Sequence, residues 1–209
     1  MSDKNFDNLV DSQDILKGIY LYGFKEPSRI QIEGIDSISS GSDCILQSQS
    51  GTGKTATYLI GVLNRLNKGL KCGLILTPTR ELAVQVYSVA TELMKFTKFK
   101  VNLCIGGTEI INYKDTNLII GTLGRINHMF SIKKINKNNI DIVVLDETDN
   151  LLSDGISNEI QTFLNNFKEN IQIIFISATL SKHVFSLGDK LLNNPKKVLL
   201  KKSEIAVDL

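Results

Sequence analysis

The chain has 209 residues, 42% of them hydrophobic, which is enough to build one packed core and hardly enough for two. Lysine and arginine number 24 against 22 aspartate and glutamate residues, so the net charge is only +2 and binding to nucleic acid through an overall basic field is excluded. No apolar run approaches the roughly 20 residues that cross a bilayer, and the first residues lack an apolar signal core, so we expect a cytoplasmic or nuclear protein that does not enter a membrane.

The three cysteines, Cys44, Cys72 and Cys104, lie in or beside predicted strands. Their spacing is not that of a metal site, and buried thiols in a reducing compartment explain them better than a disulfide framework. We therefore expect no structural metal and no disulfide.

Short apolar runs alternate with helical patterns along the chain. The runs typical of strands are Cys44–Gln47, Leu74–Thr77, Val101–Ile105, Leu118–Gly121, Ile142–Leu145, Ile173–Ile176 and Val198–Leu200. Apolar residues at three- and four-residue spacing predict helices at Ser12–Tyr22, Ser28–Ser37, Thr55–Leu66, Arg80–Lys95, Ile156–Phe167 and Lys182–Leu192. The polar stretch Lys133–Asn139 is typical of a surface loop. The alternation predicts one α/β domain over residues 1–209, with a doubly wound, mostly parallel β-sheet flanked by helices.

Ligands of open α/β sheets bind outside the carboxyl ends of the strands, so the residues that follow each predicted strand are the first candidates for chemistry. Five of these positions carry unusual sequences, at residues 48–55, 78–82, 122–125, 146–149 and 177–179. Since parallel strands end at the same edge, we expect these five segments to lie on one side of the sheet.

Residues 48–55 read Ser-Gln-Ser-Gly-Thr-Gly-Lys-Thr between a predicted strand and a predicted helix. Glycines in such a loop let successive amides converge on phosphate oxygens, while the lysine adds a charge and the last threonine a hydroxyl for Mg²⁺. The usual pattern begins with glycine, and this chain has Ser48 there. The alternative is a glycine-rich turn without a ligand. The loop predicts binding of a nucleoside triphosphate through Ser50, Gly51, Thr52, Gly53, Lys54 and Thr55.

An apolar strand ends abruptly in Asp146 and Glu147. P-loop enzymes hold Mg²⁺ with a carboxylate in this position, so we predict Asp146 and Thr55 as the metal ligands. Glu147 beside it is placed to accept a proton from the attacking water, and Lys54, Asp146 and Glu147 are the predicted catalytic set. The alternative is an acidic first turn that caps the following helix.

The combination resembles the DEAD-box RNA helicases of superfamily two, specifically their first RecA-like domain. Residues 146–149 read Asp-Glu-Thr-Asp, with Thr148 where the family has alanine and Asp149 separating it from the Asp-Glu-x-His branch. The resemblance implies a RecA-like P-loop domain with a Q motif region at 1–40, a core at 41–200 and the start of an inter-domain linker at 201–209.

The segment from Gly23 to Gln31 is similar to the family's Q motif. In that motif the glutamine reads the adenine edge and the aromatic residue, here Phe24, packs on the base; Phe6 stands where an upstream aromatic is expected. Glutamine presents one donor and one acceptor side by side, which matches adenine and mismatches guanine. The resemblance thus implies that Gln31 selects ATP.

Residues 78–85 match the family's second RNA-side motif, and the pair Gly106-Gly107 resembles its glycine pair. Contacts of this kind hold RNA phosphates without reading sequence. The alternatives are an Arg80–Glu81 ion pair and a simple glycine turn. The implied RNA-binding residues are Pro78, Thr79, Arg80, Gly106, Gly107, Thr122 and Arg125.

Residues 177–179, Ser-Ala-Thr, resemble the family's link between the ATP and RNA sites. Hydrogen bonds from Ser177 and Thr179 to the acidic cluster, including Asp149, would couple the two. The chain departs from the family at Thr148 and at Leu123, where the family has proline.

The resemblance implies the first half of an ATP-dependent RNA helicase that binds ATP-Mg²⁺ and the RNA backbone, with possible ribonucleoprotein partners. Hydrolysis and unwinding require a second RecA-like domain in cis, and we expect this chain alone to be nearly inactive. One alternative is a nucleotide-binding scaffold or RNA clamp with decayed helicase activity, motivated by Leu123 and Thr148. A small-molecule kinase or other P-loop enzyme is a more distant alternative.

Overall fold

The computed structural model describes residues 5–152, 157–179 and 181–200. Seven strands form one sheet in the order β3-β4-β2-β5-β6-β1-β7, and every pairing among the described residues is parallel. The strands are β1 (Cys44–Gln47), β2 (Cys72–Leu76), β3 (Val101–Cys104), β4 (Leu118–Gly121), β5 (Ile140–Leu145), β6 (Gln172–Ser177) and β7 (Lys196–Leu199).

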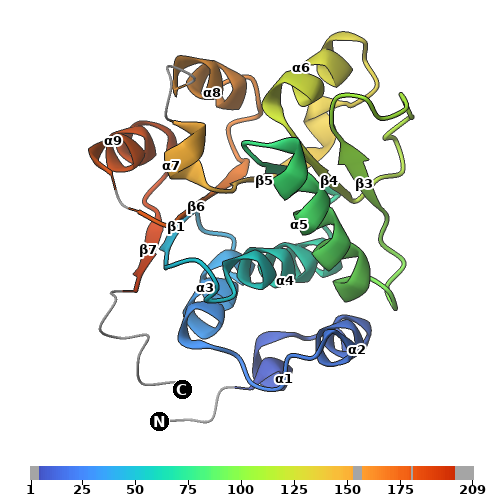
Figure 1. Cartoon of the computed structure of the whole chain (residues 1–209), viewed down its shortest axis with the longest axis vertical. Helices are drawn as coiled ribbons and strands as arrows, with labels where there is room; N and C mark the ends of the chain where they lie inside the picture. Colours follow the sequence, from blue (N-terminus) through green and yellow to red (C-terminus); the bar gives the residue numbers. More distant parts are fainter. Residues whose placement is uncertain (1–4, 153–156, 180, 201–209) are drawn as a thin grey trace.

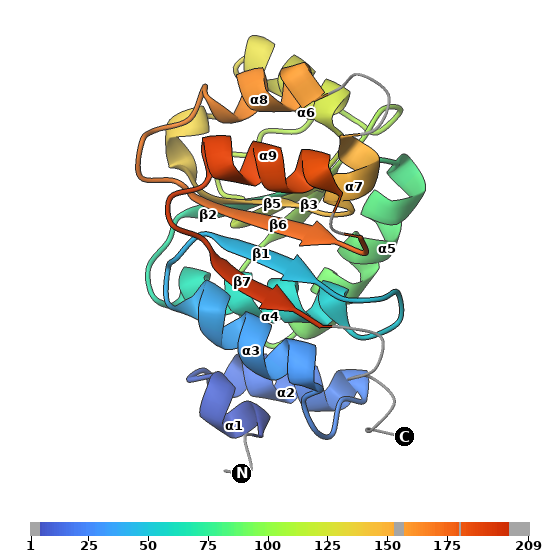
Figure 2. The ribbon, with the colours of Figure 1, turned by 90° about the vertical axis from the view of Figure 1, so that its left-hand side faces the viewer.

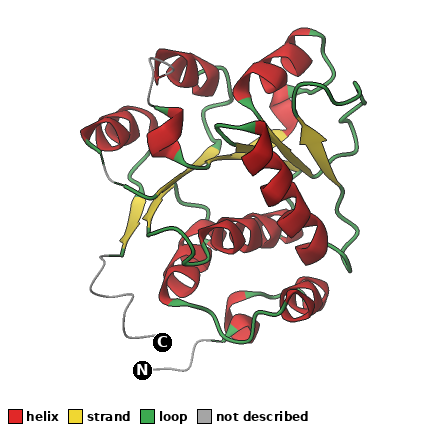
Figure 3. Ribbon diagram, in the orientation of Figure 1, coloured by secondary structure: helices red, strands yellow, loops and turns green. Residues whose placement is uncertain are grey.

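Helices cover both faces of the sheet (Figure 1; Figure 3). They are α1 (Phe6–Leu9), α2 (Gln13–Tyr22), α3 (Arg29–Ser39), α4 (Lys54–Asn67), α5 (Arg80–Leu93), α6 (Leu123–Ser131), α7 (Thr148–Leu151), α8 (Ser157–Leu164) and α9 (Lys182–Leu191). Helices α3, α4 and α5 lie on one face with α1 and α2 beyond them, while α6 to α9 lie on the other (Figure 2).

The strand sequences account for this layering. Side chains alternate along a strand, so Cys44 and Leu46 of β1 enter the core under α1 to α5, whereas Ile45 enters the core under α6 to α9. Because both faces are covered, the central strands read as continuous apolar runs rather than as an apolar and polar alternation.

Two glycines bring α3 and α4 close together. A Cβ atom at Gly34 would lie 2.4 Å from Thr57 Cγ2, and one at Gly61 would lie 2.7 Å from Ile38 Cβ. Only a residue without a side chain fits at either contact. The close approach fixes α3, which carries Gln31, against α4, which begins at Lys54.

The strand order sets the order of the loops along the carboxyl edge of the sheet. The loop after β1 (48–53) is followed in space by those after β6 (177–179), β5 (146–147), β2 (77–79), β4 (from 122) and β3 (from 105). The five segments singled out in the sequence therefore lie along one edge, with the phosphate loop toward one end and Gly106-Gly107 at the other.

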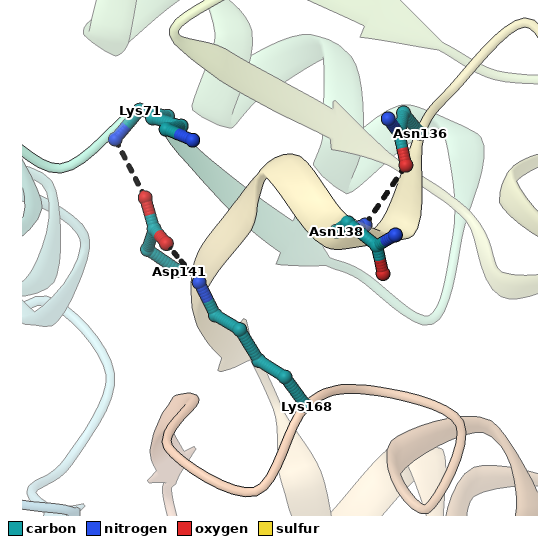
Figure 4. A network of polar contacts seen from close by, with 5 residues as sticks. All are labelled: Lys71, Asn136, Asn138, Asp141 and Lys168. Carbon is teal, nitrogen blue, oxygen red and sulfur yellow. Dashed lines mark hydrogen bonds and ion pairs between the residues drawn. The ribbon is translucent and has the colours of Figure 1, made fainter.

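The opposite edge is tied together by Asp141 at the start of β5 (Figure 4). Its carboxylate accepts a 2.6 Å hydrogen bond from the Lys71 amide and forms an ion pair with Lys168. Nearby, Asn136 Oδ1 accepts from the Asn138 amide at 3.0 Å and closes the short 3-10 turn at Lys137–Asn139. Asp141 thus joins the entry to β2 with the loop before β6.

The sequence-based expectation of a doubly wound parallel sheet is confirmed. Helices α1, α6 and α7 were not among the predicted elements. The stretch 133–139, predicted as a loop, contains one 3-10 turn at Lys137–Asn139. The helix predicted over 156–167 runs from Ser157 to Leu164, and its first predicted residue lies outside the described part of the chain. Among the described residues, each helix falls short of the length or apolarity needed to cross a bilayer.

Candidate functional site

The phosphate loop connects β1 to α4 through two left-handed glycines, Gly51 at φ 82° and Gly53 at φ 93°. Glycine adopts such angles without steric cost, so the backbone turns sharply just before the helix. Lys54 opens α4, and its ammonium group donates to the carbonyl oxygens of Ser48 and, at 2.7 Å, Gln49. The lysine therefore lies inside the curve of the loop.

Ser48, which replaces the first glycine of the usual pattern, has a structural role. It is fully buried, and its hydroxyl donates to Thr52 Oγ1 at 2.7 Å. Thr52 in turn donates to the Gln49 carbonyl at 2.8 Å. These two bonds link the two sides of the loop, so the serine that replaces glycine stabilises the conformation of the loop.

The acidic cluster lies close enough to Lys54 to influence its charge. Burial lowers the pKa of Lys54, and the carboxylates of Asp146, Asp149 and Glu147 oppose that shift. Burial raises the pKa of Asp146 to about 6, against the hydrogen bonds from Tyr58 and the Glu147 amide and the charge of Lys54. The lysine and the carboxylates therefore form one electrostatic site, although they are distant in sequence.

Asp146 follows β5 directly and is 4% exposed. Its Oδ2 accepts from the Tyr58 hydroxyl at 2.7 Å and its Oδ1 from the Glu147 amide at 2.9 Å. The sequence analysis did not identify Tyr58, because an aromatic residue on the apolar face of a helix is interpreted as a packing residue of the core. Only the structure pairs it with Asp146.

Glu147 is one of three non-glycine residues with positive φ in the described chain, at φ 47° and ψ 53°. Such backbone strain is typical of functional positions, where the surrounding structure holds it. The half-buried side chain accepts from Asn150 Nδ2 at 2.7 Å. The turn presents Glu147 at the sheet edge beside Asp146.

Thr148, the departure within the acidic segment, is bonded to the backbone. It is fully buried, and its hydroxyl donates to the Leu145 carbonyl at 2.9 Å. Its additional polar group is therefore satisfied by the backbone of β5 and is not directed at a carboxylate.

The donor set fits Mg²⁺ held jointly with a nucleotide. Among the described residues no group of three or more histidine, cysteine, aspartate or glutamate side chains could hold a metal ion unaided. Mg²⁺ in nucleotide sites takes one or two protein oxygens and completes its shell with phosphate and water. Asp146, directly after β5, and Thr55, in the first turn of α4, supply oxygens of that kind on the same edge of the sheet.

Gln31 lies against the phosphate loop. It is 2% exposed, and a Cβ atom at Gly53 would lie 2.8 Å from its Nε2. Its Oε1 accepts from the Ser28 amide at 2.8 Å in a capping box, and Ser28 Oγ donates to the Thr52 carbonyl at 3.2 Å. The start of α3 is thus joined to the loop at two points.

Phe24 is half-buried and belongs to an aromatic cluster. Its ring stacks on Tyr22 with centroids 5.2 Å apart and lies 6.1 Å from the ring of Phe6. Phe6 itself is fully buried in the core. The structure thus places the two Q-motif aromatics in contact with each other, with Phe24 the more exposed of the pair.

The segment 177–179 bridges the phosphate loop and the acidic cluster. The Ser48 amide donates to the Ser177 carbonyl at 3.3 Å. The amide and the hydroxyl of Thr179 donate to Asp149 Oδ2 at 3.1 and 2.8 Å. Ser177, in contrast, exchanges hydrogen bonds with Thr179 and reaches the cluster only through it.

The predicted RNA-binding residues gather at the ends of β2, β4 and β3. Thr79 caps α5 by accepting from the Leu82 amide at 3.2 Å, directly after Pro78. A Cβ atom at Gly106 would lie 2.5 Å from Arg80 Nη2, so the guanidinium lies against this glycine rather than pairing with Glu81. Residues that the sequence separates widely thus form one small surface.

The far side of this surface holds Arg125 on the first turn of α6. Its Nη2 donates to the Thr108 carbonyl at 2.6 Å, which fixes the loop that carries Gly107. Thr122 stands at the N-cap position of α6 without a side-chain capping bond, and its amide donates to the Cys104 carbonyl at 3.3 Å. Leu123 is 7% exposed and packs in the core, so α6 begins there without the proline that the family has.

The remaining arginines are each engaged with another side chain. Arg29 pairs with Glu33 at 2.9 Å on α3, and Arg65 donates to Gln172 Oε1 at 3.1 Å near the opposite end of α4.

Comparison with known proteins gives a consistent set of relatives. A family model described as DEAD/DEAH box helicase matches residues 28–187. The chain is 38% identical to ATP-dependent RNA helicase FAL1 of Scheffersomyces stipitis, in a match that covers 97% of this chain and 53% of FAL1. It is 37% identical to eukaryotic initiation factor 4A of Zea mays, in a match that covers 98% of this chain and 52% of that protein. It thus spans about half the length of the curated relatives that it matches.

Solved structures agree with the sequence relatives. S. cerevisiae Dbp5 bound to RNA and ADP BeF3 superposes with a TM-score of 0.87 at 32% identity, covering 96% of this chain and 53% of that one. A DEAD box protein from the hyperthermophile Methanococcus jannaschii superposes with a TM-score of 0.86 at 31% identity, covering 94% and 56%.

Proposed function

The chain belongs to the DEAD/DEAH box helicase family, and we propose that it is the first RecA-like, ATP-binding half of an ATP-dependent RNA helicase. The observation that carries this proposal is the bonded path along the sheet edge. It runs from Ser48 of the phosphate loop to Ser177 and then from Thr179 to Asp149. The path joins the phosphate loop to the acidic cluster after β5, and the proposed RNA surface begins at the end of the neighbouring strand β2.

On the nucleotide side, the loop amides and Lys54 hold the phosphates, and Gln31 with Phe24 holds the adenine. Thr55 and Asp146 would ligate Mg²⁺, which neutralises charge on the phosphate oxygens when bound. Glu147 accepts the proton of the attacking water, and its strained position beside Asp146 supports that role. These assignments make ATP-Mg²⁺ the cofactor.

On the RNA side, the proposed surface comprises Arg80, the glycine pair, Thr122, Arg125 and the start of α5. It combines charged donors with bare backbone, groups that suit sequence-independent contacts with phosphates. The single-stranded backbone of RNA is the proposed ligand, and Dbp5 bound to RNA is a relative of the same fold.

Hydrolysis and unwinding, in this proposal, require a second RecA-like domain in cis. Phosphoryl transfer of this type gains about 10³- to 10⁵-fold from an arginine finger, and Arg65, Arg80 and Arg125 are engaged with Gln172, Gly106 and Thr108. The coverage of about half of each relative supports the same arrangement. The alternative of a decayed scaffold was motivated by Thr148 and Leu123. The Thr148 hydroxyl bonds the Leu145 carbonyl and Leu123 packs in the core, which supports the helicase proposal over this alternative.

Two binding assays on this chain test the proposal. Calorimetry with Mg-ADP should show at least tenfold weaker binding for Lys54→Ala, while Lys68→Ala at the other end of α4 matches the wild type. Anisotropy of a labelled single-stranded RNA should show a similar loss for Arg80→Ala but not for Lys95→Ala, which removes the same charge from the end of α5. If the wild-type chain binds neither Mg-ADP nor the single-stranded RNA, the proposal is overturned.

A further inference from the structure

Tyr58 is a fully buried phenol whose hydroxyl reaches the acidic cluster from the adjacent helix. It lies on α4 one turn after Lys54, is 0% exposed, and donates to Asp146 Oδ2 at 2.7 Å. The two residues are 88 positions apart in sequence. The helix that begins with the phosphate-binding lysine therefore also holds the carboxylate on the neighbouring part of the sheet edge.

The second oxygen of the same carboxylate is held by a different group. Asp146 Oδ1 accepts from the Glu147 amide at 2.9 Å, so each oxygen has one fixed donor. A carboxylate has about four acceptor positions, and two donors on opposite oxygens set the plane of the group while leaving positions free. Asp146 is therefore oriented from both sides, by Tyr58 and by the strained turn at Glu147.

We propose that Tyr58 is a positioning residue that aims Asp146 at the metal of the nucleotide site. The inference rests on the proposed function, because it assigns Asp146 to Mg²⁺. Donors behind a metal ligand orient it, and their loss typically costs 10- to 100-fold in metal affinity. In this proposal Tyr58 acts through Asp146 and is itself a ligand of neither the metal nor the nucleotide.

A merely structural role for Tyr58 predicts a different result. A buried hydroxyl needs a partner, so removing the bond would cost stability in either case. Only the positioning role predicts that metal affinity changes while metal-free nucleotide affinity does not. Tyr58→Phe separates the two, because it keeps the ring in the core and removes one oxygen atom.

The test is a titration of Mn²⁺, followed by electron paramagnetic resonance, into the chain saturated with ADP. Tyr58→Phe should raise the Mn²⁺ concentration at half-saturation about 10-fold, while ADP affinity in EDTA stays within about twofold. Tyr113→Phe is the matched control, because Tyr113 is also buried at 4% exposure and bonds the Leu103 carbonyl at 3.5 Å, outside the site. This control should leave the Mn²⁺ midpoint unchanged.

A double substitution shows whether the effect passes through Asp146. In the Asp146→Asn background, Tyr58→Phe should add no further loss of Mn²⁺ affinity. The inference about Tyr58 is overturned if Tyr58→Phe leaves the Mn²⁺ midpoint of the wild type unchanged, or if it costs the same Mn²⁺ affinity in both backgrounds. Either result leaves the proposed function standing. A wild-type chain whose ADP binding ignores Mn²⁺ overturns the proposed metal site as well.

Discussion

Thr179 donates to Asp149 twice, from its backbone amide at 3.1 Å and from its hydroxyl at 2.8 Å, and both bonds end on Oδ2. The other oxygen, Oδ1, is buried without a hydrogen-bond partner among the described contacts. Asp149 is therefore held from one side only, by the segment that also touches the phosphate loop through Ser177. We expect this pair to be where nucleotide and RNA binding influence each other.

Thr179→Val tests that coupling, because it keeps the shape of the side chain and removes the hydroxyl. RNA affinity is measured with and without Mg-ADP BeF3, and the ratio gives the coupling. The ratio should fall several-fold toward 1 in the variant. Thr162→Val, on the exposed face of α8, removes a hydroxyl that bonds only its own helix and should leave the ratio intact. Equal ratios for Thr179→Val and wild type would refute the role of this pair.

Glu147→Gly should separate stability from function. Glycine relieves the left-handed backbone at φ 47°, so the free energy of unfolding should stay equal or rise by up to about 1 kcal/mol in urea titrations. In a protein that joins this chain to a second RecA-like domain, the same change should abolish ATP hydrolysis. Lys133→Gly, at φ 57° on the surface, is the control and should change stability alone. A clear loss of stability for Glu147→Gly would show that its backbone is not strained.

The Asp141 network at the opposite edge should make stability depend on acid pH. Burial raises the pKa of Asp141, but the bonds from Lys168 and the Lys71 amide outweigh it, so the folded pKa lies below the ordinary 3.8. A lowered carboxyl pKa stabilises the fold above the unfolded pKa and loses that contribution as pH falls through the folded value.

Asp141→Asn should therefore cost about 1–2 kcal/mol at pH 7, as judged by urea unfolding. The difference from wild type should persist to pH 5 and shrink as the pH falls below about 4. The exposed Asp36→Asn is the control and should cost little at any pH. A difference that grows on acidification would contradict the sign of the shift.

The cysteines should be inert in the folded protein. All three are free and buried, and burial raises the pKa of both Cys44 and Cys72 to about 12 and raises that of Cys104 as well. At pH 8 almost no thiolate forms, so reaction with a disulfide reagent should be at least about 100-fold slower in the native state than in guanidinium. A thiol that reacts within seconds in the native protein would contradict this burial.

Local sequence predicted most of the sheet because each strand is a short apolar run bounded by turn residues. Cys44–Gln47 and Leu118–Gly121 agree with the structure at both ends. Helix α1 escaped prediction because four residues do not establish a helical period. Helix α6 starts at Leu123 without the usual proline, so its beginning had no signal beyond Thr122.

The site could be predicted where its functional residues are adjacent in the sequence, as in residues 48–55 and 146–149. It was not predictable where a contact joins distant elements. The partner of Tyr58 depends on the placement of α4 beside β5, and Arg80 against Gly106 depends on the neighbouring ends of the β2, β4 and β3 strands. Such contacts follow from topology, which local periodicity does not encode.

The central claim is that this sheet edge is an adenine-nucleotide site, and base selectivity tests it most directly. Calorimetric titration of Mg-ADP and Mg-GDP should show at least tenfold preference for ADP in the wild type and nearly none in Gln31→Ala. Ser28→Ala, which removes the other half of the capping box, should weaken both nucleotides alike and keep the preference. Equal binding of the two nucleotides by the wild type, or no binding of either, would contradict the account.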